Sequence, residues 1–389
     1  MTFKNSKTEI SNDEVVAALD FAVEQIHRNL PDYTYRSQNH STVNGFYPAV
    51  DNVQWTSGFW PGAIWLAYEY SQDRCFQYAG QIQVQSFLHR IKNHIDTDHH
   101  DMGFMFSPSC VSAWKLVADE DARQAAILGA DQLVARFQPI GNFIQAWGEM
   151  SQPENYRYII DALMNLPLLY WAAKETGNEH FLDVAHKHAE TTLQNSIRDD
   201  GSTFHSFFMD RVTGEPVKGV AVQGYKNNSA WARGQAWAVY GMALLYQFEK
   251  EERYRDAFDR VLRYFLSYLP DDMIPYWDLS FTKGSEPRDS SSASIVACGL
   301  LEMARHVSET QAREYESIAR QFMKSLHDNY AVKSPEEANG LVLHGTYSKK
   351  SPYNSCTEEG VDECMSWGDY FYMEALMRLY KNWHSYWSA

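Results

Sequence analysis

The sequence predicts an all-α protein with the (α/α)6 barrel fold, a toroid of six helical hairpins. Three observations lead to this fold class. Of the 389 residues, 44% are apolar and 14% aromatic, which is enough to bury a large core. Apolar residues recur at the helical spacing i, i+3, i+4 and i+7 along most of the chain. Segments that are apolar on nearly every side alternate with segments that are charged along one side, as an inner and an outer ring of helices requires.

The helical periodicity defines the expected elements in chain order. No Pro-, Ser- or Gly-rich linker interrupts them, so we expect one domain that comprises residues 1–389. The expected helices are 12–29, 58–72, 74–95, 103–118, 120–136, 157–175, 178–196, 230–248, 250–268, 290–308, 310–329 and 366–382.

The apolar helices recur along the chain like a degenerate helical-hairpin repeat. They begin about every sixty residues, which is within the range of such repeats. A closed ring of hairpins needs no polar capping repeats, whereas an open solenoid does. An irregular α-solenoid or a pair of helical bundles is the alternative. The buried helices begin near residues 58, 103, 157, 230, 290 and 366.

Composition and motifs narrow the function. The chain has 34 basic and 50 acidic residues, a net charge of −16, which disfavours nucleic acid and anionic membranes as partners, and nothing indicates an obligate protein partner. Five cysteines without a C-x-x-C pair favour a reducing compartment. Because residues 1–13 also lack the apolar core of a signal peptide, we expect a cytoplasmic protein. No P-loop, G-x-G-x-x-G, G-x-S-x-G or H-E-x-x-H is present, so we expect no cofactor.

The connections that lead into the buried helices are long, and long ordered loops are mostly functional. In a toroid these loops surround one mouth. Aromatic faces beside hydrogen-bonding groups suit a sugar, so we expect a carbohydrate site there. The loops and adjoining helix starts carry Trp55, His99, His100, Asp101, Trp147, His205, Gln223, Tyr276, Trp277 and Trp367.

Asp161 is the most informative single residue, because it stands in an apolar run within the expected helix 157–175. Burial there raises the pKa of a carboxyl group, as a general acid requires. The alternative is a structural carboxylate that caps the backbone or pairs with an arginine.

Asp101 and Arg233 each allow two interpretations. Asp101 ends the run Asp98-His99-His100-Asp101, where it serves either as the N-cap of the next helix or as a site carboxylate. No second His-rich element completes a ligand set, so we expect no metal. Arg233, at the start of a buried helix, can form a two-pronged pair with a carboxylate of the protein or of a ligand.

Several motifs together resemble the unsaturated glucuronyl hydrolases, family 88 of the glycoside hydrolases. The resemblance extends from about residue 50 to residue 380. The related unsaturated rhamnogalacturonyl hydrolases share the barrel and are the nearest alternative. The motifs are QWTSGFWPG at 54–62, HHDMGF at 99–104, IQAWG at 144–148, IID at 159–161, WARGQAW at 231–237, RDSSSA at 288–293 and WGDY at 367–370.

The resemblance implies an (α/α)6 barrel that acts on oligosaccharides left by polysaccharide lyases. These enzymes hydrate the C4=C5 bond of a terminal unsaturated uronic acid. Asp161 resembles the acid/base that protonates C4 and then takes a proton from the water that adds at C5, and Asp101 resembles the second acidic residue. The positions that resemble substrate contacts are Trp55, His100, Trp147, His205, Gln223, Arg233 and Trp237.

A loop late in the chain resembles the Ser-x-x-Ser-x-Lys loop of members that prefer sulfated substrates. Ser348 and Ser351 match the two serines, but Tyr353 stands where the lysine would be, with Lys349 and Lys350 between the serines. We expect both serines to contact substrate. Two further functions stay open: a polysaccharide lyase, which would create the double bond, and a non-catalytic carbohydrate-binding toroid.

Overall fold

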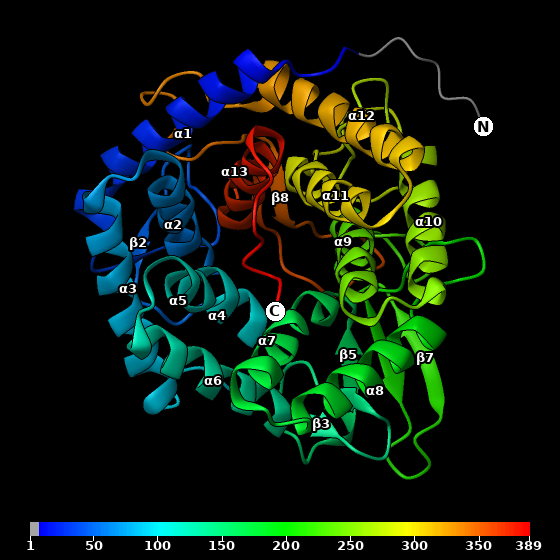
Figure 1. The fold of residues 1–389 in the computed structure, drawn as a ribbon. Coiled ribbons are helices and arrows are strands. Elements are labelled where there is room, and N and C mark those ends of the chain that lie inside the picture. Colours follow the sequence, from blue (N-terminus) through cyan, green and yellow to red (C-terminus); the bar gives the residue numbers. More distant parts are fainter. Residues whose placement is uncertain (1–7) are drawn as a thin grey trace.

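The helices form two concentric rings (Figure 1), and the structure, a computed structural model, describes residues 8–389. The outer ring consists of α1 (Asn12–Tyr33), α3 (Arg74–Lys92), α6 (Glu120–Ala135), α8 (His180–Asn195), α10 (Glu252–Ser267) and α12 (Glu309–Ser325). The inner ring consists of α2 (Phe59–Ser71), α4 (Met102–Phe106) continued by α5 (Ser112–Val117), α7 (Pro167–Thr176), α9 (Ala232–Glu249), α11 (Ser290–Met303) and α13 (Ser366–Tyr380). This arrangement confirms the predicted (α/α)6 barrel.

Burial follows the alternation that the sequence predicts. Every residue of α11 is buried, and so are the first fifteen residues of α9, because both helices lie between the outer ring and the axis of the barrel. The outer helix α10 instead buries one stripe, in which Tyr254, Phe258, Val261 and Phe265 follow each other at helical spacing. Its remaining residues are mostly charged and face solvent.

The region around residue 160 differs from the predicted helix 157–175. Arg157–Ile159 forms strand β5, Ile160–Met164 forms a 3-10 turn, and α7 begins only at Pro167. The Ile160 amide donates to the His205 carbonyl at 3.0 Å. Pairing with a strand some fifty residues later therefore overrides the local helical periodicity, because a local sequence pattern holds no information on so distant a partner.

Short antiparallel strands line the connections on the side where the inner helices begin. The structure also interrupts the expected helix 103–118 with a π-helical turn, Ser107–Val111, between α4 and α5. The paired strands are β1 (Ser37–Gln38) with β2 (Ala49–Val50), β3 (Phe137–Gln138) with β4 (Phe143–Ile144), β5 with β6 (Ser206–Met209) and β6 with β7 (Pro216–Val220), and β8 (Gly345–Ser348) with β9 (Glu359–Glu363).

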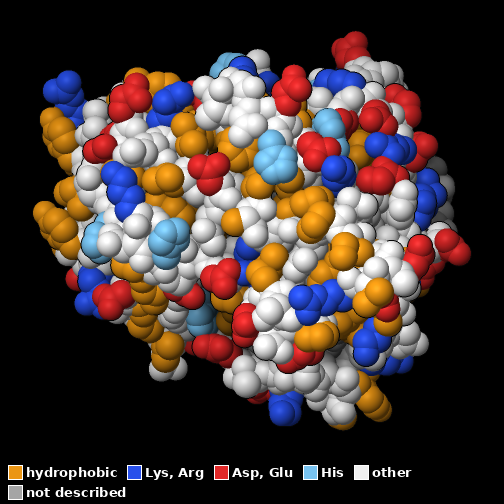
Figure 2. Space-filling model, turned by 90° about the horizontal axis from the view of Figure 1, so that it is seen from below, with side chains coloured by type: hydrophobic (Ala, Val, Ile, Leu, Met, Phe, Trp, Pro, Cys, Tyr) orange, Lys and Arg blue, Asp and Glu red, His pale blue; other side chains and the backbone are white. Residues whose placement is uncertain are grey.

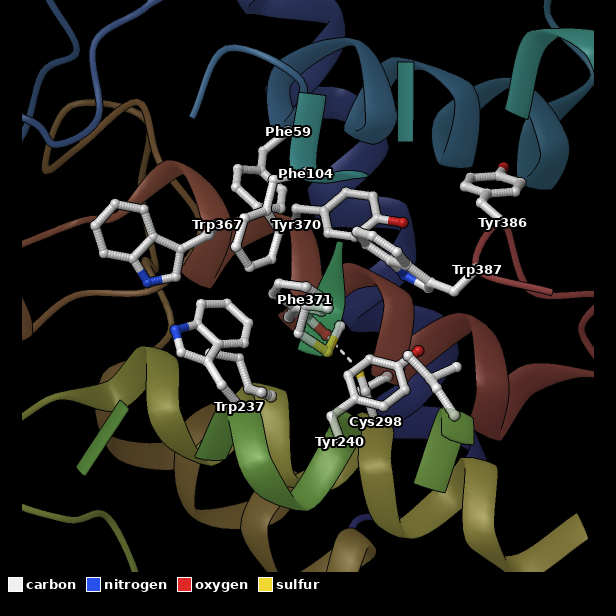
Figure 3. Close-up of a cluster of buried hydrophobic side chains, with 14 of the residues drawn as sticks. Phe59, Phe104, Trp237, Tyr240, Cys298, Trp367, Tyr370, Phe371, Tyr386 and Trp387 are labelled. Atoms are coloured by element: carbon white, nitrogen blue, oxygen red, sulfur yellow. Dashed lines mark hydrogen bonds between the residues drawn. The ribbon is translucent and has the colours of Figure 1, made fainter. Parts of the chain in front are cut away.

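The interior of the ring is packed with aromatic side chains. Figure 3 shows Phe371 of α13 between Trp237 of α9 and Trp387 of the C-terminal segment, with ring centroids at 5.5 and 5.9 Å. The C-terminal end of the described chain lies near the middle of the ring (Figure 1). Its Trp387 indole donates to the buried Glu374 at 2.8 Å, so this segment fills the axis of the barrel behind the aromatic core.

The first and last parts of the chain meet and close the ring. The Ile10 amide donates to the Arg320 carbonyl at 3.1 Å, and Lys324 of α12 forms an ion pair with Glu14 of α1 at 2.7 Å. Within residues 8–389, none of the helices is long and apolar enough to cross a membrane. Acidic and basic side chains are interspersed with hydrophobic ones on the face that Figure 2 shows.

Candidate active site

A cavity of about 340 Å³ opens at the end of the barrel where the inner helices begin. The structure brings most of the predicted site residues together here. The predicted residues that line the cavity are Trp55, Asp101, Trp147, Asp161, His205, Gln223, Arg233 and Trp237. The lining residues that we did not predict are Arg157, Ile159, Ser206, Val222, Trp231 and Tyr347.

A close backbone contact brings the two predicted carboxyl groups to one place. Gly103, in the first turn of α4, lies against Asn165 so closely that a Cβ atom at this position would be 2.3 Å from the Asn165 Cα. The Asn165 side chain accepts from the Phe104 amide at 2.8 Å and donates to the Asp161 carbonyl at 3.2 Å. Glycine and asparagine thus join α4, which follows Asp101, to the 3-10 turn that carries Asp161.

The Asp161 side chain projects from the 3-10 turn into the cavity and is 15% exposed. Its Oδ1 atom has no hydrogen-bond partner, and its carboxylate forms no ion pair with an arginine, within the part of the chain that the structure describes. Burial, together with the nearby charge of Asp101, raises the pKa of Asp161 well above its usual range. This environment is the one expected for a general acid, and the arginine-paired alternative is not what the structure contains.

Asp101 stands at the N-cap position of α4, but its side chain forms no cap hydrogen bond. The carboxylate lines the cavity instead. Burial raises the pKa of Asp101 to about 8, although a hydrogen bond from the Trp147 side chain and the charge of Arg136 oppose the rise. Asp101 thus occupies the N-cap position without capping the helix through its side chain, and its carboxylate faces the cavity.

His100 lies behind the two carboxyl groups and is fully buried. Its Nε2 atom is 3.3 Å from the Asp101 Oδ1 and 3.5 Å from the Asp161 Oδ1. Burial holds the pKa of His100 well below its usual range, so the ring is neutral and offers one N–H. Ligand atoms of these three residues lie within 4.8 Å of one another, a spacing that suits the sharing of a proton and that a divalent cation would also fit.

Arg233 is held by the protein through both amino groups, while its buried Nε has no hydrogen-bond partner in the described chain. Its Nη1 donates to Asp289 at 2.9 Å and to the Thr346 carbonyl at 2.5 Å, and its Nη2 donates to the Tyr347 carbonyl at 2.6 Å and to Gln223 at 3.2 Å. The sequence allowed a two-pronged pair between Arg233 and a carboxylate. The structure contains a pair with Asp289, but only one nitrogen of Arg233 takes part in it. Arg233 therefore fixes strand β8 at the cavity.

Aromatic rings form the walls of the cavity. Trp147 stacks on His99 with centroids 4.3 Å apart, and Trp55 stacks on Trp367 at 5.4 Å. The His205 ring lies beside Trp231, and burial lowers the pKa of His205 to about 3. These rings thus offer flat, uncharged faces, as the stacking of a sugar ring requires.

The two predicted loop serines do not line the cavity. The Ser348 hydroxyl donates to the Thr357 carbonyl at 2.7 Å, and the Ser351 hydroxyl donates to the Tyr225 carbonyl at 2.6 Å. Between them, Lys349 forms an ion pair with Glu358 at 2.6 Å. These groups hold the loop in shape, so the structure does not bring Ser348 and Ser351 to the other site residues.

Comparison with known proteins identifies the family. The model of Glycosyl Hydrolase Family 88 matches residues 26–381. The chain is 43% identical over 381 residues to an unsaturated chondroitin disaccharide hydrolase of Streptococcus pneumoniae, covering 97% of this chain and 95% of that protein. An unsaturated glucuronyl hydrolase from Streptococcus agalactiae superposes with a TM-score of 0.95 at 41% identity, covering 100% of this chain and 98% of that one. A mutant of that enzyme, complexed with dGlcA-GalNAc6S, has a TM-score of 0.87 at 38% identity and the same coverage. The chain therefore belongs to glycoside hydrolase family 88.

Proposed function

We propose that the protein removes the 4,5-unsaturated uronic acid from the non-reducing end of lyase-generated glycosaminoglycan oligosaccharides of the chondroitin, hyaluronan or heparin type. One observation carries the proposal. Two carboxyl groups with raised pKa values lie beside His100, at 3.3 and 3.5 Å, in a cavity walled by aromatic rings. The names of the similar proteins, which act on unsaturated chondroitin disaccharides or glucuronyl groups, support the substrate class.

The proposed reaction is a hydration that ends in loss of the neighbouring sugar. Protonated Asp161 gives its proton to C4, and positive charge develops on C5 and the ring oxygen. The Asp161 carboxylate then takes a proton from the water that adds to C5, so the enzyme ends as it began. The resulting hemiketal opens to a C5 ketone, and the hemiacetal left at C1 expels the neighbouring sugar as an alcohol.

Asp101 and His100 support the proton transfer in this proposal. When Asp161 loses its proton, a protonated Asp101 keeps two negative charges from lying next to each other beside the neutral His100 ring. The walls formed by Trp55 and Trp147 exclude water and orient the sugar. Arg233 fixes the strand behind the cavity. The cytoplasm as the compartment, and the absence of any partner other than the oligosaccharide, remain predictions of the cysteine content and the charge.

Product labelling tests the proposal. In D₂O the enzyme should leave deuterium at C4 of the released keto-uronate, and the near-ultraviolet absorbance of the conjugated double bond should fall. Attack at the anomeric carbon, as in ordinary glycosidases, would leave C4 unlabelled. A rising absorbance would indicate a lyase, and unchanged absorbance on every unsaturated disaccharide, including those from rhamnogalacturonan, would indicate a binding protein. Any of these three results would overturn the proposal.

A further inference from the structure

We infer that Arg157, at the rim of the cavity, binds a sulfate ester on the sugar that leaves. This inference rests on the proposed function and adds a specificity-determining residue to it. No sequence motif pointed to Arg157, because residues 157–159 carry a helical periodicity. The structure places it on strand β5, four residues before Asp161, among the residues that line the cavity.

The sheet β5–β6–β7 turns one face to the cavity. Side chains alternate between the faces of a strand, and Arg157 and Ile159 of β5 line the cavity together with Ser206 of β6. Tyr158 and Phe207 point the other way into a separate buried cluster. Arg157 is therefore on the cavity face of the sheet.

Position along β5 separates Arg157 from the reacting atoms. Two residues of a strand span about 6.7 Å, so Arg157 lies about that far along β5 from Ile159, which itself lies two residues before Asp161. The terminal uronate must place C4 at Asp161. The next sugar then lies toward the mouth, within reach of Arg157, whose side chain is long enough to meet a substituent on it.

Arg157 is a cation without an acidic partner. Its Nη1 donates to the Asn155 side chain at 3.2 Å and to the Glu154 carbonyl at 3.3 Å. Among residues 8–389, Arg157 forms no ion pair with a carboxylate, and its Nε and Nη2 have no protein acceptor. In a chain with a net charge of −16, an unpaired arginine at a cavity presents donors that match a planar or tetrahedral oxyanion.

Most donors of the other candidate anion-binding groups are already engaged. The Arg233 amino groups donate to Asp289 and to backbone carbonyls, and the hydroxyls of Ser348 and Ser351 donate to the carbonyls of Thr357 and Tyr225. Within the described chain, Arg157 and Arg233 are the two arginines that line the cavity. Arg233 keeps only its buried Nε without a partner, whereas Arg157 keeps both Nε and Nη2 for a ligand.

Lys218 extends the positive charge of the rim. In the register of the sheet, Arg157 is opposite Phe208, and Phe208 is opposite Lys218. The Arg157 guanidinium and the Lys218 ammonium lie 5.8 and 5.3 Å from the Phe208 ring centroid. Both cations are therefore on the same face, and the exposed Lys218 raises the local potential without touching the cavity.

Steady-state kinetics on matched substrates tests the inference. The substrates are unsaturated chondroitin disaccharides that carry no sulfate, a 4-sulfate or a 6-sulfate. Arg157→Gln should raise KM for at least one sulfated disaccharide about tenfold or more, as loss of charge-assisted hydrogen bonds implies, with kcat and the unsulfated KM within about twofold. Arg157→Lys, which keeps the charge but not the planar fork, should recover part of the loss.

The controls distinguish contact from folding. Arg28→Gln removes an exposed arginine paired with Glu24 on α1 and should leave all three KM values unchanged, while Lys218→Gln should raise the sulfated KM by a smaller factor. If Arg157→Gln melts earlier than the parent, Arg157→Lys and Lys218→Gln carry the test.

Two outcomes would overturn the inference. Equal losses on sulfated and unsulfated substrates would assign Arg157 to the uronate carboxylate that all of them share, and unchanged KM values on all three would remove Arg157 from the substrate. A parent enzyme that hydrolyses none of the disaccharides would instead refute the proposed function, so the two failures are distinguishable.

Discussion

Asp161 and Asp101 show how burial prepares two identical side chains for one task. Both lie in the same cavity with pKa values raised by burial, and His100, neutral and fully buried, lies beside both of them. Two carboxylates this close to each other repel when both are charged, so the pair holds at least one proton near neutral pH. Asp161, which is part-exposed to the cavity and has a free Oδ1, is the one of the two that is open to a ligand in the cavity.

Asp161→Asn should lose a factor of at least about 10² to 10⁴ in kcat, because proton transfer by a positioned side chain contributes that much. The amide keeps the size and hydrogen-bonding capacity of the carboxyl, so substrate affinity should change little. Single-turnover rates and equilibrium binding of the disaccharide separate the two effects. A variant with more than about a tenth of the parent rate would leave Asp101 as the candidate acid.

Asp101→Asn should raise the melting temperature at alkaline pH and leave it nearly unchanged at pH 4. The folded pKa of Asp101 is about 8 against an ordinary aspartate value of 3.8, so the folded state binds the proton more tightly and stability falls as the pH rises from about 4 to 8. An asparagine carries no such penalty. Melting curves at pH 4.5 and 8.5 measure the effect, with the exposed Asp51→Asn as control. If the difference in melting temperature between Asp101→Asn and the parent does not grow with pH, the raised pKa of Asp101 is contradicted.

The residues of the site could be predicted only in part. Asp161 was found because a carboxyl in an apolar run signals burial whichever element carries it, even though the expected helix is a strand followed by a 3-10 turn. Asp101 allowed an N-cap interpretation that only its side-chain direction decides. Arg157 gave no signal, because its place at the cavity depends on pairing with β6, which is distant in the sequence.

Among the secondary-structure elements, the inner and outer helices can be told apart from the sequence, because a helix that is buried on all sides has no polar stripe. Strands of two or three residues cannot be predicted in this way, since such segments are ordered by the strands with which they pair.

The C-terminal segment supports the cavity from behind. The Trp387 ring centroid lies 6.4 Å from that of Phe104. The Phe104 centroid in turn lies 5.5 and 5.0 Å from those of Trp55 and Trp237, which line the cavity.

Trp387→Ala should cost about 3 to 5 kcal/mol of unfolding free energy, as expected for a buried aromatic truncated in a packed core. It should also lower kcat/KM, because the cavity walls lose their support. Trp387→Phe keeps the ring contacts but loses the hydrogen bond to Glu374 and should cost less. Urea denaturation and disaccharide kinetics measure both effects, with Tyr35→Ala, 81% exposed, as control. Unchanged stability in Trp387→Ala would mean that the segment does not support the core.

The net charge of the protein, −16, opposes the approach of an anionic sugar. The Debye length falls from about 30 Å at 0.01 M salt to about 10 Å at 0.1 M. The approaching substrate therefore senses the entire protein at low salt but mainly the rim with Arg157 and Lys218 at the higher concentration.

The parent kcat/KM should accordingly rise about twofold or more between 0.01 and 0.1 M sodium chloride, as distant repulsion is screened before the local attraction. Initial rates at substrate concentrations well below KM measure this directly. Neutral sucrose at matched osmolality should have no such effect. A fall over the same range would mean that the rim, rather than the net charge, governs the approach of the substrate.

Closure of the ring by α1 and α12 has a consequence for how the protein is made. Arg320 lies 310 residues after the Ile10 carbonyl to which it donates. At about 5 to 20 residues per second, the ribosome needs roughly 15 to 60 s to synthesise that length. During this time the apolar stripe of α1, which includes Val15, Leu19 and Ile26, has no α12 or α13 to cover it. The nascent chain therefore exposes part of this apolar stripe until its last hairpin emerges.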